Sequence, residues 1–190
     1  MSGPAHEAVG SDGEAVRYRI MTVCTGNICR SPMAEVVLRR RLDEAGLGDA
    51  VEVCSTGITD EEHGNPIDRR AQTVLREHGY DVPRREARQV RATDLTAHDL
   101  VLAMTSMHAR ALRRLAKTPD VADRVVMYRS FDPDAPTVPP GQPDHPLDID
   151  DPWYGGMEDF QVCLAQVEAA AGPIVEHVRA ELEERGLTSA

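Results

Sequence analysis

Short apolar runs alternate with longer amphipathic segments along most of this 190-residue chain. The apolar runs are YRIMTVC (18–24), VEVCST (51–56), LVLAM (100–104) and RVVMYRS (124–130), and each predicts a strand. The amphipathic segments at 31–47, 65–79, 106–116 and 157–186 predict helices. Strands that alternate with helices form parallel sheets covered on both faces, so the pattern indicates an α/β domain.

Proline, glycine and asparagine mark the ends of these helices. Pro32 stands in the first turn of the first helix and Gly46 ends it, while Asn65 is the predicted N-cap of the second helix. The last helix is expected to bend near Gly172 and Pro173, because proline removes a backbone donor inside a helix.

Residues 131–156 contain enough prolines and glycines to exclude regular structure over roughly two dozen residues. A loop of that length in a compact domain is typically functional rather than a linker. No internal repeat or second domain is evident. We therefore predict one domain over 18–186, with a disordered tail at 1–17 and a short tail at 187–190.

Charge and cysteine content restrict the partners and the compartment. The formal net charge of −11 creates a field that repels nucleic acids and anionic membranes, and neither is expected as a partner. Four cysteines in a chain of this length do not make a disulfide framework, and no apolar stretch approaches the ~20 residues that span a bilayer. The first residues lack the basic and apolar regions of a secretory signal. We therefore predict a cytoplasmic protein.

Two cysteines stand close together in VCTGNICRSPMAE (23–35), which joins the first predicted strand to the first predicted helix. A structural metal site needs converging ligands, and Cys24 and Cys29 have neither the usual spacing nor a second pair of ligands. The seven histidines are scattered along the chain, so no metal and no cofactor are predicted. Cys54 and Cys163 are interpreted as buried structural cysteines.

The position of Cys24 indicates a nucleophile facing an anion. This residue ends a strand and opens a loop into a helix N-terminus, at the edge where parallel sheets bind ligands. The free N–H groups and partial positive charge of a helix N-terminus attract anions. A cysteine there can have a pKa of ~3.5–7.5 instead of ~8.5, which makes its thiolate available at neutral pH.

The residues after Cys24 suit a phosphate group. Arg30 can make two parallel hydrogen bonds to phosphate oxygens, and Gly26 permits a close approach of the backbone. Asn27 tolerates the left-handed conformation that a tight loop needs, and its amide can bond across the loop. Ser31 either donates a hydrogen bond to the Cys24 sulfur or caps the helix.

The segment CTGNICRS resembles the phosphate-binding loop, Cys-x5-Arg-Ser, of the low-molecular-weight protein tyrosine phosphatases. Similarity continues through CSTG, LREHGY, EARQV, YRSFDP and DDPWYGG and covers roughly residues 18–185. Classical and dual-specificity tyrosine phosphatases instead place His before the cysteine, where this chain has Val23. The resemblance implies a three-layer sandwich whose central sheet has four parallel strands in the order 2-1-3-4, in a monomer or weak dimer.

The resemblance also assigns roles within the site. It implies that Cys24 is the nucleophile, that Arg30 clamps the phosphate and that Asp151 is the general acid and base. From the acidic loop alone, Asp148, Asp150 and Asp151 would all be candidates, or merely a solvated turn. The remaining phosphate-binding residues are Thr25, Gly26, Asn27, Ile28, Cys29 and Ser31.

Four further residues are expected to line the substrate cleft, namely Ser55, Glu61, Trp153 and Tyr154. The two aromatic residues form an apolar wall for a substrate ring, or Trp153 is a buried anchor of its loop. Glu61 and the neighbouring Glu62 disfavour acidic phosphopeptides and favour basic ones, or they are simply solvated.

Two departures from the family concern the support of the loop. Arg85 stands where many members have His, and Thr105 where many have Asp, so the hydrogen bonds around Ser55 are expected to differ. Cys29 matches a family cysteine that can bond the nucleophile under oxidation, and a plain structural role is the alternative.

We predict a protein tyrosine phosphatase that hydrolyses phosphotyrosine in protein substrates through a phosphocysteine and releases inorganic phosphate. A related arginine phosphatase type tends to have Thr where Ile28 stands. Arsenate reductases of similar fold need two further, closely spaced cysteines, which Cys54 and Cys163 do not supply. A non-catalytic phosphate-binding module is the alternative from a different class.

Overall fold

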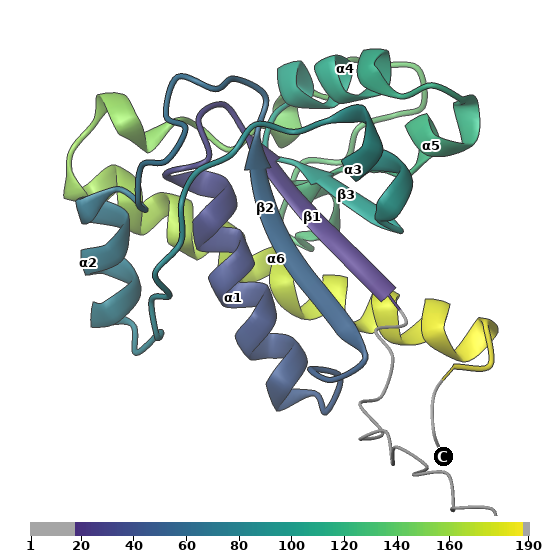
Figure 1. The fold of residues 1–190 in the computed structure, drawn as a ribbon, viewed down its shortest axis with the longest axis horizontal. Helices are drawn as coiled ribbons and strands as arrows, with labels where there is room; N and C mark the ends of the chain where they lie inside the picture. Colours follow the sequence, from purple (N-terminus) through teal and green to yellow (C-terminus); the bar gives the residue numbers. More distant parts are fainter. Residues whose placement is uncertain (1–17, 188–190) are drawn as a thin grey trace, which may run out of the picture.

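The computed structural model describes residues 18–187 and contains one four-stranded sheet (Figure 1). The strands are β1 (Tyr18–Cys24), β2 (Val51–Gly57), β3 (Leu100–Ala103) and β4 (Val125–Met127). Every pair is parallel and the order is β2-β1-β3-β4, which confirms the predicted topology. Strand β1 lies between β2 and β3, so its carboxyl end opens at the middle of one sheet edge.

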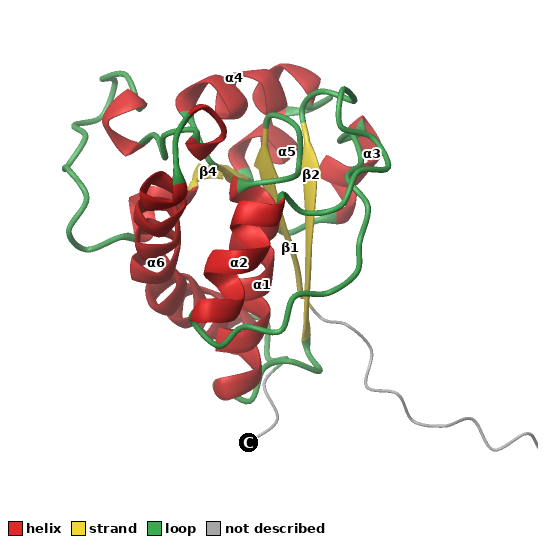
Figure 2. Cartoon of the chain, turned by 90° about the vertical axis from the view of Figure 1, so that its left-hand side faces the viewer, coloured by secondary structure: helices red, strands yellow, loops and turns green. Residues whose placement is uncertain are grey.

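Helices cover both faces of the sheet, as Figures 1 and 2 show. One face carries α1 (Arg30–Glu44), α2 (Arg69–Glu77) and the long α6 (Met157–Glu184). The other face carries α3 (Ala92–Ala97), α4 (Ser106–Leu115) and α5 (Pro119–Asp123). The predicted three-layer sandwich is therefore confirmed.

Alternating side chains of the central strands divide the core into two parts. Ile20 and Leu102 pack in the cluster under α1, α2 and α6. Met21 and Val101 pack in the opposite cluster, with apolar residues of α3, α4 and α5. Because successive strand residues point to opposite faces, a strand buried on both sides is apolar at nearly every position. This is why the apolar runs identified the strands.

Several boundaries differ from the prediction. Helix α2 begins at Arg69, and its N-cap is Asp68, whose carboxylate accepts the Arg70 N–H at 2.7 Å. Asn65, the predicted N-cap, instead forms a turn in which its amide donates to Glu62. The fourth strand ends at Met127, and residues 128–131 form a 3-10 helix.

Two helices were not predicted, and the last helix has no interruption. Helices α3 and α5 have only six and five residues, too short to show an amphipathic period. Helix α6 runs unbroken through Gly172 and Pro173, and the bend expected there stays a prediction. The loop at 131–156 contains two short 3-10 helices, His145–Leu147 and Pro152–Tyr154.

The predicted tail at 1–17 lies outside the described residues, as do residues 188–190 of the tail predicted at 187–190. Leu187, the first residue of that second tail, packs against the core. In the part of the chain that the structure describes, no helix combines the length and apolar character needed to cross a membrane.

Candidate active site

The loop between β1 and α1 lies at the carboxyl edge of the sheet. Cys24 ends β1 and is buried, and Arg30 begins α1. The adjacent end of β2 closes against this loop, because the Ile58 and Thr59 amides donate to the carbonyls of Cys24 and Thr25 at 2.9 and 3.1 Å. The predicted strand-loop-helix unit is therefore present.

Gly57, at the end of β2, allows this close approach. A Cβ at this position would lie 2.5 Å from the Thr25 carbonyl oxygen and 3.0 Å from the Gly26 carbonyl carbon. These are backbone atoms that cannot move without distorting the loop. The sequence signal was the glycine of CSTG, whose role depends on a neighbour more than thirty positions earlier in the chain.

Asn27 shapes the centre of the loop. It is the one non-glycine residue with positive φ in the described chain, at 63°, which confirms the predicted left-handed conformation. Its amide nitrogen donates to Ser31 Oγ and Ser55 Oγ, both at 2.9 Å. Its side-chain oxygen accepts from Arg85 Nη2 and from the Arg88 N–H. The side chain is thus bonded on both sides, and Asn27 is fully buried.

Ser31 connects this network to the thiol. Its hydroxyl oxygen accepts from Asn27 and lies 3.0 Å from Cys24 Sγ, so its own hydrogen is free to point at the sulfur or at the Thr56 carbonyl, 3.3 Å away. Helix α1 has Cys29 as its N-cap and no side-chain cap. Of the two alternatives for Ser31, the contact with the sulfur is the one present.

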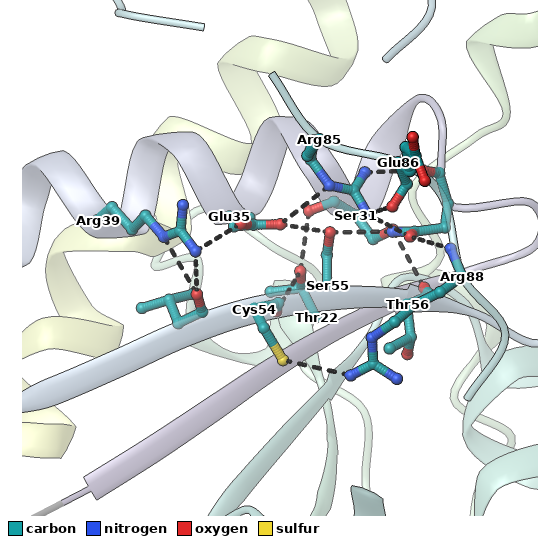
Figure 3. Close-up of polar contacts among 12 residues, drawn as sticks. Thr22, Ser31, Glu35, Arg39, Cys54, Ser55, Thr56, Arg85, Glu86 and Arg88 are labelled. Atoms are coloured by element: carbon teal, nitrogen blue, oxygen red, sulfur yellow. Dashed lines mark hydrogen bonds and ion pairs between the residues drawn. The ribbon is translucent and has the colours of Figure 1, made fainter. Parts of the chain in front are cut away.

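Behind the loop, the Glu35 carboxylate contacts two arginines and a serine hydroxyl (Figure 3). The carboxylate accepts from Ser55 Oγ at 2.5 Å, pairs with Arg39 at 2.8 Å and faces Arg85 at 3.7 Å. Burial lowers the pKa of the Arg85 guanidinium, and the nearby Glu35 carboxylate opposes that shift. Arg85 also donates to the Asn27 carbonyl at 3.0 Å.

This network corrects the prediction for Ser55. Only 3% of Ser55 is exposed, and it lies behind the loop rather than on the cleft wall. Arg85 does contact the network, as the expectation of altered hydrogen bonds required. Thr105 does not, because its hydroxyl caps α4 by accepting the His108 N–H at 3.2 Å.

Arg30 and Asp151 meet at the mouth of the loop. Arg30 Nη2 donates to Asp151 Oδ2 at 2.5 Å and to Thr25 Oγ1 at 3.2 Å, while Nη1 donates to the Ile149 carbonyl at 3.1 Å. The side chain of Arg30 is 5% exposed and that of Asp151 is 29% exposed, so the pair joins the interior to the surface.

The structure separates the three candidate acids. Asp148 accepts the N–H of Ser106, the first residue of α4, at 2.6 Å. Asp150 is exposed. Asp151 lines the cleft, and its Oδ1 accepts the Trp153 N–H at 3.2 Å. This hydrogen bond from Trp153 caps the 3-10 helix Pro152–Tyr154 and sets the direction of the Asp151 carboxylate.

The cleft over the loop has a polar floor and a wall of mixed character. Its lining consists of Cys24, Thr25, Gly26, Ile28, Cys29, Arg30, Glu61, Glu62, Asp151, Trp153 and Tyr154. Trp153 and Tyr154 are 44% and 89% exposed, so Trp153 is not a buried anchor. Asn27 and Ser31, predicted to bind phosphate, support the loop from behind.

Sequence reasoning missed His108, which lies beneath the loop. Its Nε2 is 3.0 Å from Thr25 Oγ1, and no part of the residue is exposed. Burial, followed by the charge of Arg30, lowers the pKa of His108 to about 3, so the ring is neutral near pH 7. Thr25 therefore bonds both Arg30 and a neutral histidine.

The other cysteines lie in surroundings that keep thiols protonated. Burial raises the pKa of Cys54 to about 11 and that of Cys163 to about 12. Burial and the Asp68 carboxylate raise the pKa of Cys29 well above its ordinary value. Within residues 18–187, no three His, Cys, Asp or Glu side chains converge as they would to hold a metal ion.

Comparisons with known proteins agree on one family. The family model for low molecular weight phosphotyrosine protein phosphatases matches residues 19–184. A low molecular weight protein-tyrosine-phosphatase of Streptomyces coelicolor is 45% identical over 168 residues, which cover 88% of this chain and 98% of that relative. Low molecular weight protein-tyrosine phosphatase A of Mycobacterium tuberculosis is 44% identical over 164 residues, 86% of this chain and 93% of that relative.

A solved structure extends the agreement to the fold. The crystal structure of a protein tyrosine phosphatase from Entamoeba histolytica has a TM-score of 0.76 with this chain at 25% identity. The match covers 90% of this chain and 99% of the other.

Proposed function

The chain belongs to the low molecular weight phosphotyrosine protein phosphatase family, and from that premise we propose that it hydrolyses phosphotyrosine in proteins through a phosphocysteine at Cys24. The observation that carries the proposal is the meeting of a thiol, a guanidinium and a carboxylate in one cleft. Cys24, Arg30 and Asp151 all line it, and Arg30 contacts Asp151 directly.

In the first step, the thiolate of Cys24 attacks phosphorus in line with the bond to the leaving oxygen. An S–P bond forms as the P–O bond breaks, and the phenolate oxygen takes the proton of Asp151. Arg30 and the loop amides hold the equatorial oxygens, where the transition state carries its charge. Ser31, at 3.0 Å from the sulfur, is placed to stabilise the thiolate by donating a hydrogen bond.

Substrate binding changes the partner of Arg30. A phosphate dianion carries more negative charge than one carboxylate and offers two oxygens to the guanidinium fork. Arg30 therefore turns its donors to the phosphate. Asp151, released from that ion pair, takes up a proton from solvent and faces the leaving oxygen as an acid. The capping bond from Trp153 to Asp151 does not depend on Arg30 and keeps the carboxyl group at the cleft.

In the second step, Asp151 acts as a base. It removes a proton from water, the water oxygen attacks phosphorus, and the S–P bond breaks to release inorganic phosphate and the Cys24 thiolate. The same residue thus serves both steps in opposite protonation states.

The cleft wall supports an aryl phosphate as substrate. Ile28, Trp153 and Tyr154 supply apolar surface around the polar floor, as a phosphorylated ring requires. Phosphoarginine has a polar guanidinium in place of the aromatic ring, and the apolar Ile28 stands where the arginine phosphatase type tends to have Thr. The alternative activity on phosphoarginine is therefore less well supported.

The experiment compares phosphotyrosine, phosphoarginine and phosphoserine versions of one peptide by phosphate release. We expect turnover of the phosphotyrosine peptide, and its loss in Cys24→Ser. Cys54→Ser is the matched control, because it makes the same change outside the cleft and should keep activity. Near-normal turnover in Cys24→Ser would exclude the mechanism, and preference for phosphoarginine would exclude the substrate.

The proposal includes reversible oxidation at the same loop. Peroxide oxidises the Cys24 thiolate to a sulfenic acid, which condenses with the Cys29 thiol to form a disulfide and water. Because burial raises the pKa of Cys29, this thiol stays protonated and peroxide oxidises Cys24 in preference to it. After peroxide treatment, dithiothreitol should restore the activity of the wild type, and Cys29→Ala should recover much less.

A further inference from the structure

Arg70, in the first turn of α2, contacts the segment that carries the proposed acid. We call residues 151–155 the acid segment. Arg70 Nη1 donates to two of its backbone carbonyls, that of Trp153 at 3.3 Å and that of Gly155 at 3.0 Å. The guanidinium also stacks over the Trp153 ring at 5.5 Å and over the Phe160 ring at 4.6 Å. One side chain therefore bonds the backbone and packs on the aromatic wall.

Asp68 holds the other side of the Arg70 guanidinium. Its Oδ1 accepts from Nε and its Oδ2 from Nη2, each at 3.2 Å. Asp68 is itself tied to the phosphate loop, because its N–H donates to the Ile28 carbonyl at 2.8 Å. A continuous chain of contacts thus runs from Ile28 through Asp68 and Arg70 to Trp153.

Two arginines therefore hold the acid segment at different points. Arg30 binds the Asp151 carboxylate itself, whereas Arg70 binds the backbone two and four positions later. The two contacts differ once a substrate is bound. In the proposed mechanism, the phosphate takes over the donors of Arg30, but the carbonyls bound by Arg70 are not exchanged for any substrate group.

We infer that Arg70 is a positioning residue that keeps Asp151 at the leaving oxygen after substrate phosphate has taken Arg30. The inference rests on the proposed function, since it concerns the acid of that mechanism. Arg70 does not line the cleft and has no role in binding phosphate. Its removal should therefore impair the proton transfer and leave the attack of the thiolate largely intact.

Leaving groups separate these two effects. Phenyl phosphate expels a basic phenolate and needs the acid, whereas p-nitrophenyl phosphate expels a stabilised phenolate and needs it little. Because small displacements of a catalytic group can cost ~100-fold, we expect Arg70→Met to lower kcat/KM for phenyl phosphate by roughly 10- to 100-fold. The loss for p-nitrophenyl phosphate should be several times smaller. A purely structural defect would lower both values by the same factor.

Arg76→Met is the matched control, because Arg76 is exposed on the same helix and donates only to Gln72 among the contacts described. It should behave as wild type with both substrates. Arg70→Lys keeps the charge but lacks the fork that spans Asp68 and the two carbonyls, so it should show a partial loss of the same kind. Arg70→Lys also gives the comparison if Arg70→Met fails to fold.

A double variant tests whether Arg70 acts through Asp151. Asp151→Asn alone should lose activity mainly with phenyl phosphate, and adding Arg70→Met should then lower the phenyl phosphate value little further. Multiplying losses in the double variant would overturn the inference, as would equal losses with both substrates or an equal loss in Arg76→Met. If Asp151→Asn itself shows no dependence on the leaving group, the proposed acid is wrong, which is a different failure.

Discussion

The ion pair behind the phosphate loop should contribute measurably to stability. Arg85 is 13% exposed and Glu35 is 5% exposed, and Arg85 also donates to the carbonyl and side-chain oxygens of Asn27. The change Arg85→Met keeps much of the apolar stem and removes the charge and every donor. It leaves a buried carboxylate short of one cation and the left-handed Asn27 short of two hydrogen bonds.

The magnitude follows from what remains. Removing one partner of a buried pair costs about 3–5 kcal/mol when the other charge is left alone. Glu35 is not left alone, because it keeps Arg39 at 2.8 Å and Ser55 at 2.5 Å. We therefore expect a loss of about 2–3 kcal/mol in the free energy of unfolding, near the value for hydrogen bonds to a charged group. In a domain of this size, the loss corresponds to a fall in Tm of about 4–12 °C.

Thermal and urea unfolding of four variants, the single Glu35→Gln among them, measure this effect. The control is Arg41→Met, which removes an exposed pair with Glu44 in the last turn of α1 and should change Tm little. Adding Glu35→Gln to Arg85→Met removes the unpaired carboxylate, so the double variant should be more stable than the sum of the single losses by about 1 kcal/mol. A Tm for Arg85→Met equal to that of Arg41→Met, or strictly additive losses, would contradict this prediction.

Three further predictions concern single positions. Gly57→Ala should destabilise the protein by about 1–3 kcal/mol and reduce kcat/KM, because its Cβ would meet the backbone of Thr25; kinetics and unfolding of the variant check this, and unchanged values would contradict it. Glu61→Lys should raise kcat/KM for a phosphopeptide with acidic neighbours by up to about fivefold at low salt and not for p-nitrophenyl phosphate, since the exposed carboxylate on the cleft wall repels such peptides. His108 has a folded pKa of about 3, below its unfolded value of ~6.5, so its contribution to stability is lost as pH falls from about 6.5 towards 3, with a limiting slope of ~1.4 kcal/mol per pH unit. The difference in unfolding free energy between wild type and His108→Gln should follow that slope, and a difference independent of pH would contradict it.

Local patterns predicted the sheet and the loop because both depend on short stretches of sequence. The apolar runs identified the four strands, and Asn27 has the left-handed conformation that a tight loop requires. The N-cap of α2 was misplaced because Asn65 and Asp68 are both capping residues. The sequence does not show that a turn with Glu62 engages the first and leaves the second at the helix.

Contacts between distant segments account for most of what was missed. His108 lies beneath Thr25 although 83 positions separate them. No sequence pattern near either residue indicates that the two are in contact. Ser55 was assigned to the cleft from the resemblance of CSTG to the family, and it lies within β2. Its side chain points behind the loop instead, where Asn27 and Glu35 satisfy it.

Arg85 and Arg70 show why position and partner must be known together. The sequence marked Arg85 as unusual, but its meaning depends on Glu35 and Asn27, 50 and 58 positions earlier in the numbering. Nothing in the sequence singled out Arg70. An arginine in the first turn of a helix interacts unfavourably with the helix dipole, and its side chain is ordinarily solvated. The five hydrogen bonds of Arg70 to Asp68, Trp153 and Gly155, the one from its own N–H included, place a cation against the acid segment. In the proposed mechanism, Cys24 and Arg30 of the phosphate loop act on the phosphate, and Arg70, outside the loop, keeps the proton donor in place.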